Sequence, residues 1–163
     1  MGRWMPFAAL IVLVLAAAPG MFAQARLDLS GTWRLNYDLS ESPVGGGGID
    51  VTFPSEMVVT QSPTELSVTR RSVRQSTFAA TYRLDGSKVS VEAPAGITET
   101  GEARFEGAAL VITSRRSFSS PAGDTVVEFR ETWVVSGNVL TVKKTVTQDG
   151  DSQAASAAYD RQK

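Results

Sequence analysis

The chain has 163 residues, of which 42% are hydrophobic, and a formal net charge of −1 at neutral pH. This length predicts one domain, and the near-zero charge argues against nucleic acid or an anionic membrane surface as a partner. The sequence contains no histidine and no cysteine, which excludes disulfides, nucleophiles activated by histidine and the usual zinc sites. We therefore expect no cofactor, no metal site and no catalytic residues, although carboxylate, tyrosine or lysine chemistry stays open.

Residues 1–25 are typical of a signal peptide. Arg3 supplies a positive start, the segment from Phe7 to Ala18 is apolar throughout, and Ala23-Gln24-Ala25 matches a small-x-small cleavage site. We expect cleavage near Ala25, or as a second choice after Ala23, and an extracytoplasmic protein that is periplasmic or secreted. The alternative is an uncleaved anchor, but this apolar run is shorter than the roughly 20 residues of a membrane helix. Without cysteine there is no lipid attachment, so we expect no stable membrane anchor after cleavage.

Residues 26–163 are predicted to form the single mature domain, which opens with a strand from Ser30 to Tyr37. Trp33, Leu35 and Tyr37 alternate with polar residues there, which places the three on one face of the strand. A loop is predicted over residues 38–54. It contains two prolines and four consecutive glycines, a composition that disfavours a helix.

Short strand-like segments separated by turn residues fill the rest of the chain. Asp85-Gly86 and Asp149-Gly150 are strong hairpin signals, because both residue types tolerate a positive φ. Loops are predicted at Ala93–Gly101 and Pro121–Asp124. The predicted strands are Met57–Ser62, Glu65–Val73, Thr77–Leu84, Lys88–Glu92, Ala103–Glu106, Ala109–Phe118, Thr125–Val135, Val139–Thr147 and Ser152–Arg161.

This spacing predicts an all-β fold, an antiparallel up-and-down meander of about 8–10 strands. We expect the meander to close into a barrel, because closure removes exposed strand edges that promote aggregation. A β-sandwich is the alternative.

The first strand carries Gly31-Thr32-Trp33, which resembles the opening of calycin barrels, the group that includes lipocalins and fatty-acid-binding proteins. In that superfamily the tryptophan closes one end of the barrel, and a basic residue from the last strand lies across it. The resemblance implies a lipocalin-like barrel in which Gly31 and Trp33 form the signature and Arg161 covers the indole. The chain departs from fatty-acid-binding proteins in two places. A glycine-rich loop replaces their helix pair, and Tyr159-x-Arg161 replaces their terminal Arg-x-Tyr.

Apolar alternation also predicts which side chains face the interior. The alanines of the last strand either leave space inside or allow a close-packed wall, and the sequence does not choose between these. The predicted inward residues are Trp33, Leu35, Leu66, Val68, Phe78, Ala80, Tyr82, Leu84, Val89, Val91, Leu110, Ile112, Val127, Phe129, Trp133, Val135, Leu140 and Val142.

Basic pairs follow the start of three strands that run in the same direction in a simple meander. Counting in steps of two places Arg70, Arg116 and Lys144 on the inward face near one end of the barrel, with Glu131 also inward. One interpretation is a cavity mouth that binds a carboxylate or phosphate, with an apolar tail deeper inside. The other is a set of solvated charges at strand ends, with Glu131 as the partner of any cation that is buried.

These observations favour an extracytoplasmic, lipocalin-like protein that binds a small hydrophobic or amphipathic anionic ligand. A ligand-free envelope interaction or structural module is the alternative. A pocket-type isomerase or cyclase is the third reading, and the lack of a catalytic motif counts against it.

Overall fold

The computed structural model describes residues 27–41, 52–72, 77–93, 97–121 and 123–163. These residues form ten strands and no helix. The described part of the chain therefore contains no long apolar helix of the kind that crosses a membrane. The predicted signal peptide at residues 1–25 and most of the predicted loop at 38–54 lie outside the described residues.

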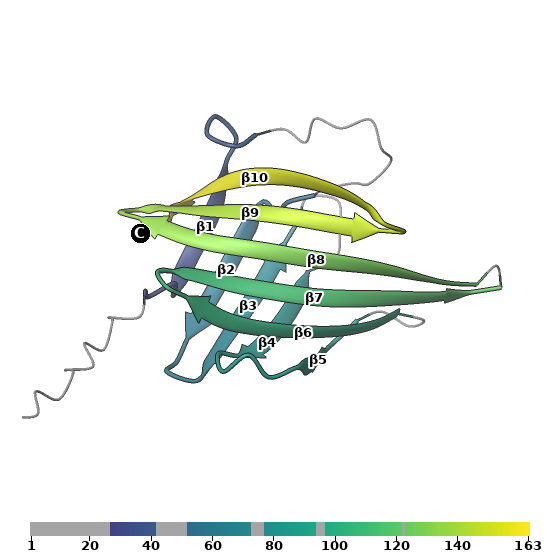
Figure 1. The fold of residues 1–163 in the computed structure, drawn as a ribbon. Helices are drawn as coiled ribbons and strands as arrows, with labels where there is room; N and C mark the ends of the chain where they lie inside the picture. Colours follow the sequence, from purple (N-terminus) through teal and green to yellow (C-terminus); the bar gives the residue numbers. More distant parts are fainter. Residues whose placement is uncertain (1–26, 42–51, 73–76, 94–96, 122) are drawn as a thin grey trace, which may run out of the picture.

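All ten strands belong to one antiparallel sheet, whose order is β4-β3-β2-β1-β10-β9-β8-β7-β6-β5. In Figure 1, β6 to β9 run across the front of the molecule, and β1 to β4 cross behind them. The sheet therefore curls into a nearly closed barrel, which confirms the predicted meander and excludes the sandwich. The strands are β1 (Gly31–Asn36), β2 (Glu56–Gln61), β3 (Glu65–Arg71), β4 (Phe78–Arg83), β5 (Val89–Val91), β6 (Ile97–Glu106), β7 (Ala109–Ser120), β8 (Gly123–Ser136), β9 (Val139–Gln148) and β10 (Asp151–Arg161).

One seam of the barrel lacks a ladder, because β4 and β5 lie at the two ends of the sheet order and do not pair. At one end of the seam Asp85 forms an isolated bridge with Arg104. Beside this bridge, the amide of Gly86 donates to the carbonyl of Ala103 at 3.0 Å. Farther along, the ring of Tyr82 lies so close to Gly101 that a Cβ there would be 2.6 Å from Tyr82 Cε1. Side-chain packing thus closes part of the seam that hydrogen bonds leave open.

The sequence placed several strand ends incorrectly. The predicted turn at Ala93–Gly101 is wrong in its second half, because β6 already begins at Ile97 and pairs with β7 up to Phe118. Gly101 resembled a turn residue, but it is a strand position against which an aromatic ring packs. Gly123 and Asp124 likewise belong to β8 rather than to a loop.

Tyr37 was predicted to share the inward face of Trp33, but it lies beyond the end of β1 and is exposed. The ladder between β1 and β10 stops at the pair Asn36–Ala158. There the Asn36 side chain accepts hydrogen bonds from the amides of Asp38 and Leu39, so the chain turns away.

The predicted inward face is otherwise correct: each residue assigned to it from the alternation is buried or half-buried. On the last strand Ala157 packs in the main core and Ala154 is exposed, so the alanine segment does not leave a continuous empty channel. The core also contains inward residues that the pattern did not identify, namely Leu29, Met57, Val59, Ala103, Val146 and Tyr159.

Candidate functional site

Trp33 and Arg161 lie together at one end of the barrel. They are cross-strand neighbours on β1 and β10, and the Arg161 guanidinium lies 4.4 Å from the centroid of the Trp33 ring. The guanidinium also donates to the carbonyls of Ser30 and Asp28, each at 3.0 Å, and the Trp33 indole donates to the carbonyl of Leu29 at 2.9 Å. Gly31 lies beside the Arg161 side chain, because a Cβ added at Gly31 would be 3.8 Å from Arg161 Cγ. The Trp33 indole is fully buried, so this group closes that end of the barrel.

A second polar group crosses the barrel interior. Arg70 at the end of β3 reaches Glu131 on β8, with Nη2 3.1 Å from Oε2. The Trp133 indole donates to the same Oε2 at 2.9 Å, and the Arg70 guanidinium lies 5.9 Å from the Trp133 ring centroid. Since β3 and β8 are not neighbours in the sheet, this group ties opposite walls together.

Lys144 on β9 lies next to Glu131, its cross-strand neighbour. The Lys144 Nζ is 3.9 Å from Glu131 Oε1, and it donates to the carbonyl of Thr52 at 3.2 Å. Two residues farther along, the carbonyl of Pro54 accepts a hydrogen bond from the Tyr159 hydroxyl at 3.1 Å. Two inward side chains therefore hold residues 52–54, which lie directly before β2.

Arg116 on β7 pairs with Glu99, its cross-strand neighbour on β6. The Glu99 carboxylate oxygen Oε2 lies 2.7 Å and 2.8 Å from two guanidinium nitrogens, and its side chain is only 4% exposed. Phe129 lies between this pair and Lys144, because the Arg116 guanidinium and the Lys144 ammonium are each 5.2 Å from its ring centroid.

These charged groups line a cavity of about 280 Å³. Its volume is close to the lower end of the range for small-molecule sites. Polar and aromatic side chains surround it, and the lining residues are Thr52, Pro54, Arg70, Ser72, Phe78, Glu99, Ser114, Arg116, Phe129, Glu131 and Lys144.

The electrostatics of the cavity follow from its burial. Burial alone would raise the pKa of Glu131, but the Arg70 and Lys144 cations and the Trp133 hydrogen bond outweigh it, so the pKa lies below its usual range. Burial lowers the pKa of Lys144, and Glu131 offsets only part of this effect. Burial raises the pKa of Tyr82 and of Tyr159, which keeps both phenols neutral. Glu131 is therefore an ionised acceptor rather than a proton donor.

The structure brings all four predicted ligand-site residues to one cavity. The side chains of Arg70, Glu131 and Lys144 are 14%, 13% and 15% exposed, whereas that of Arg116 is 31% exposed. The pairing of Arg70 with Glu131 is the one that the second interpretation names for a buried cation. The sequence reading missed Glu99, since the segment around it was assigned to a turn. It also missed Thr52, which contributes a backbone carbonyl and so has no side-chain signal.

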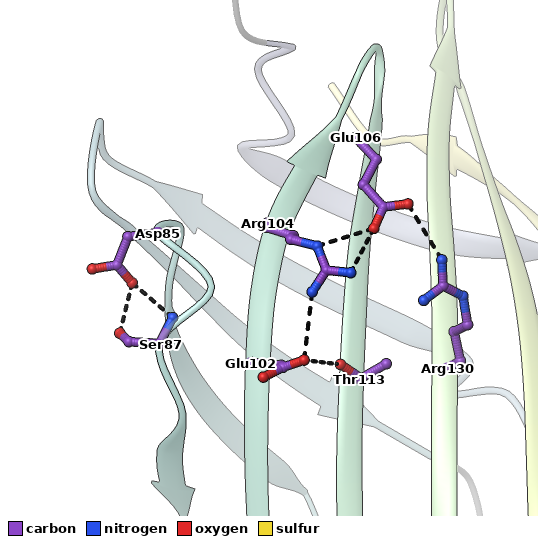
Figure 2. A network of polar contacts seen from close by, with 7 residues as sticks. All are labelled: Asp85, Ser87, Glu102, Arg104, Glu106, Thr113 and Arg130. Atoms are coloured by element: carbon purple, nitrogen blue, oxygen red, sulfur yellow. Dashed lines mark hydrogen bonds and ion pairs between the residues drawn. The ribbon is translucent and has the colours of Figure 1, made fainter.

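Another polar network lies on the outer face of β6, β7 and β8 (Figure 2). Arg104 pairs with Glu106 at 2.7 Å, and Glu106 also pairs with Arg130 at 3.3 Å. These groups are exposed, so their ion pairs contribute little stability. An open groove of about 480 Å³ lies beside them, lined by side chains that include Thr113, Arg115 and Thr145. Both the groove and the cavity carry charges of both signs, and Phe129 belongs to the lining of each. Most charged side chains of the groove are exposed, whereas those of the cavity are largely buried, so we place the candidate site at the cavity.

No set of three or more metal-ligating side chains lies close together in the described part of the chain.

Neither a protein-family model nor a curated protein matches the sequence. Among solved structures, the chain is similar to zebrafish ileal bile acid-binding protein in complex with cholic acid. The TM-score is 0.51 at 15% identity, over 82% of this chain and 98% of that one. It is also similar to the REP1-NXSQ fatty acid transporter, with a TM-score of 0.50 at 11% identity, over 83% of this chain and 96% of that one. At such identities the likeness shows the fold alone, an antiparallel β-barrel.

Proposed function

We propose that residues 26–163 form a single domain that binds a small amphipathic anion inside the barrel and does not act as an enzyme. The observation that carries the proposal is the set of three inward cations around one cavity, Arg70, Arg116 and Lys144. Charged side chains inside a barrel are costly to desolvate, and even when paired they often stabilise the fold no more than apolar side chains would. An anionic ligand gives them a purpose beyond packing.

The packing indicates how such a ligand lies. The barrel below the cavity is filled by large, fully buried side chains, among them Trp33, Trp133 and Tyr82. An apolar tail cannot go deeper than the charges, contrary to the orientation expected from the sequence. The side chains of Phe78 and Phe129 line the cavity itself and offer apolar contact there. The anionic group therefore enters first, and the apolar body lies against these two rings.

The fold comparisons support binding over catalysis. The two similar structures are a bile acid-binding protein with cholic acid and a fatty acid transporter. Bile acids and fatty acids both combine an apolar body with an anionic group, which fits the charges of this cavity. Glu131, the carboxylate that a pocket-type enzyme would use, is held ionised, and its oxygens are occupied by Arg70, Trp133 and Lys144. A ligand-free structural module would account for the filled interior beneath the cavity, but it gives no role to the three cations around the cavity.

We also propose that the protein acts outside the cytoplasm, after cleavage near Ala25. The support is the sequence of residues 1–25 alone: a positive start, an apolar run and a small-residue cleavage site.

A matched pair of arginine variants tests ligand binding. Arg115 and Arg116 are adjacent on β7, but Arg116 lines the inner cavity whereas Arg115 is exposed on the outer groove. We expect Arg116→Gln to weaken binding of an anionic amphiphile such as decanoate by roughly tenfold or more, because the substitution leaves the Glu99 carboxylate in the cavity without its counter-charge. Arg115→Gln should leave it unchanged. Titration calorimetry on folded samples measures both, and equal affinities for the two variants would contradict an interior site.

A further inference from the structure

We infer that Lys144 is the cation that holds the ligand's anionic group, and that the site accepts one negative charge rather than two. This inference rests on the proposed function and divides the work among the three cations. It assigns Arg70 and Arg116 to permanent pairs within the protein.

The partners of the three cations differ. Arg70 has a carboxylate oxygen at 3.1 Å and Arg116 has one at 2.7 Å. The nearest carboxylate oxygen to Lys144 is at 3.9 Å, too far for a hydrogen bond. Its hydrogen bond goes instead to an uncharged group, the carbonyl of Thr52.

That carbonyl therefore occupies the place of an anionic oxygen. An ammonium bonds more strongly to a charged oxygen than to a neutral one, because charge-assisted hydrogen bonds are about twice as strong as neutral ones. Lys144 is thus the group from which a ligand gains most, since Thr52 gives up only a neutral contact. Arg70 and Arg116 already have charged partners, so a ligand anion gains less from them.

The charge balance of the cavity sets the number of ligand charges. Among the described residues it holds three cations, Arg70, Arg116 and Lys144, and two carboxylates, Glu99 and Glu131. A single negative charge neutralises this set. A second one would remain without a counter-ion beside two buried carboxylates, which is costly. A carboxylate or sulfonate fits this balance, and a phosphate monoester in its doubly charged form does not.

Probes with the same alkyl tail test this inference: decanoate, decanesulfonate and decyl phosphate. They are compared by titration calorimetry below their micelle concentrations, at constant ionic strength and near-neutral pH, where the phosphate is largely a dianion because its second pKa is about 6. We expect the carboxylate and the sulfonate to bind at least about tenfold more tightly than the phosphate, the size of one charged hydrogen bond.

Variants of two adjacent lysines give the residue-level test. Lys144→Gln should lower the affinity for both monoanions by roughly tenfold or more, and Lys144→Arg should retain most of that affinity. Lys143, the exposed neighbour on the same strand, supplies the control, and Lys143→Gln should bind as the parent does. If Lys144→Gln does not fold, the comparison of phosphate with sulfonate on the parent protein decides alone.

The outcomes separate the two proposals. If no probe binds to the parent protein, the proposed function fails and the inference fails with it. If the monoanions bind but the dianion binds equally well, or Lys144→Gln keeps full affinity, the inference is overturned while the proposed function stands.

Discussion

Glu131 shows how one side chain links the packing of this barrel to its chemistry. Its Oε2 accepts from Arg70 and from the Trp133 indole, and its Oε1 faces Lys144. Arg70 comes from the opposite wall, so this carboxylate holds two sides of the barrel together and sets the charge of the cavity floor. The inward direction of both residues follows from period-two counting. Their contact does not, because it depends on which walls face each other after closure.

Replacing Glu131 tests that role. Glu131→Gln leaves the Arg70 guanidinium buried without a counter-charge, so we expect a loss of about 3 kcal/mol in the free energy of unfolding. Glu128→Gln, an exposed change on the same strand, should stay within about 0.5 kcal/mol. Urea denaturation followed by circular dichroism measures both.

The effect should also depend on pH. The pKa of Glu131 is held below its ordinary value of 4.5 in the folded chain. Its contribution is therefore complete above that value and is lost as the pH falls through the folded-state pKa. The difference between parent and Glu131→Gln should shrink at acidic pH, and a difference that does not change with pH would contradict the ion pair.

At the scale of the strands, alternation and turn residues were sufficient for most of the fold. Asp149 and Gly150 have φ values of 52° and 89°, the positive values that their hairpin turn predicts. The pattern failed where a strand position imitates a turn. Glu99 and Gly101 on β6 are polar and small, yet both face inward, one toward Arg116 and the other toward Tyr82. Such positions are explained by tertiary partners that the local sequence does not reveal.

Gly101 gives the prediction for this scale. In Gly101→Ala the added methyl would collide with the Tyr82 ring, so we expect a loss of about 1–3 kcal/mol in the free energy of unfolding. The control is a double-mutant cycle with Tyr82→Leu, which removes the ring. The cost of the alanine should nearly vanish in that background. A cost that is the same in both backgrounds would show that the seam is not closed by this contact.

The whole molecule is a barrel with one sealed end and a charged cavity. Trp33 and Arg161 seal the end, as the calycin resemblance of the first strand implied, and the similar solved structures share this fold. The sequence could indicate the inward cations, because their positions follow from alternation along single strands. It could not show that the interior beneath them is filled, since that depends on how Trp133, Tyr82 and Trp33 pack together across the barrel. Because the interior is filled, we expect the ligand to bind with its charged group deepest. This is the reverse of the orientation expected from the sequence.

The central claim is that this cavity carries a small amphipathic anion. Native mass spectrometry of the protein, isolated from the extracytoplasmic fraction of its own host, tests it most directly. We expect a polypeptide mass that begins at Arg26, plus a reproducible added mass that is lost on denaturation and identifies an anionic amphiphile. A bare polypeptide mass that stays bare after incubation with a lipid extract of the host would contradict the claim.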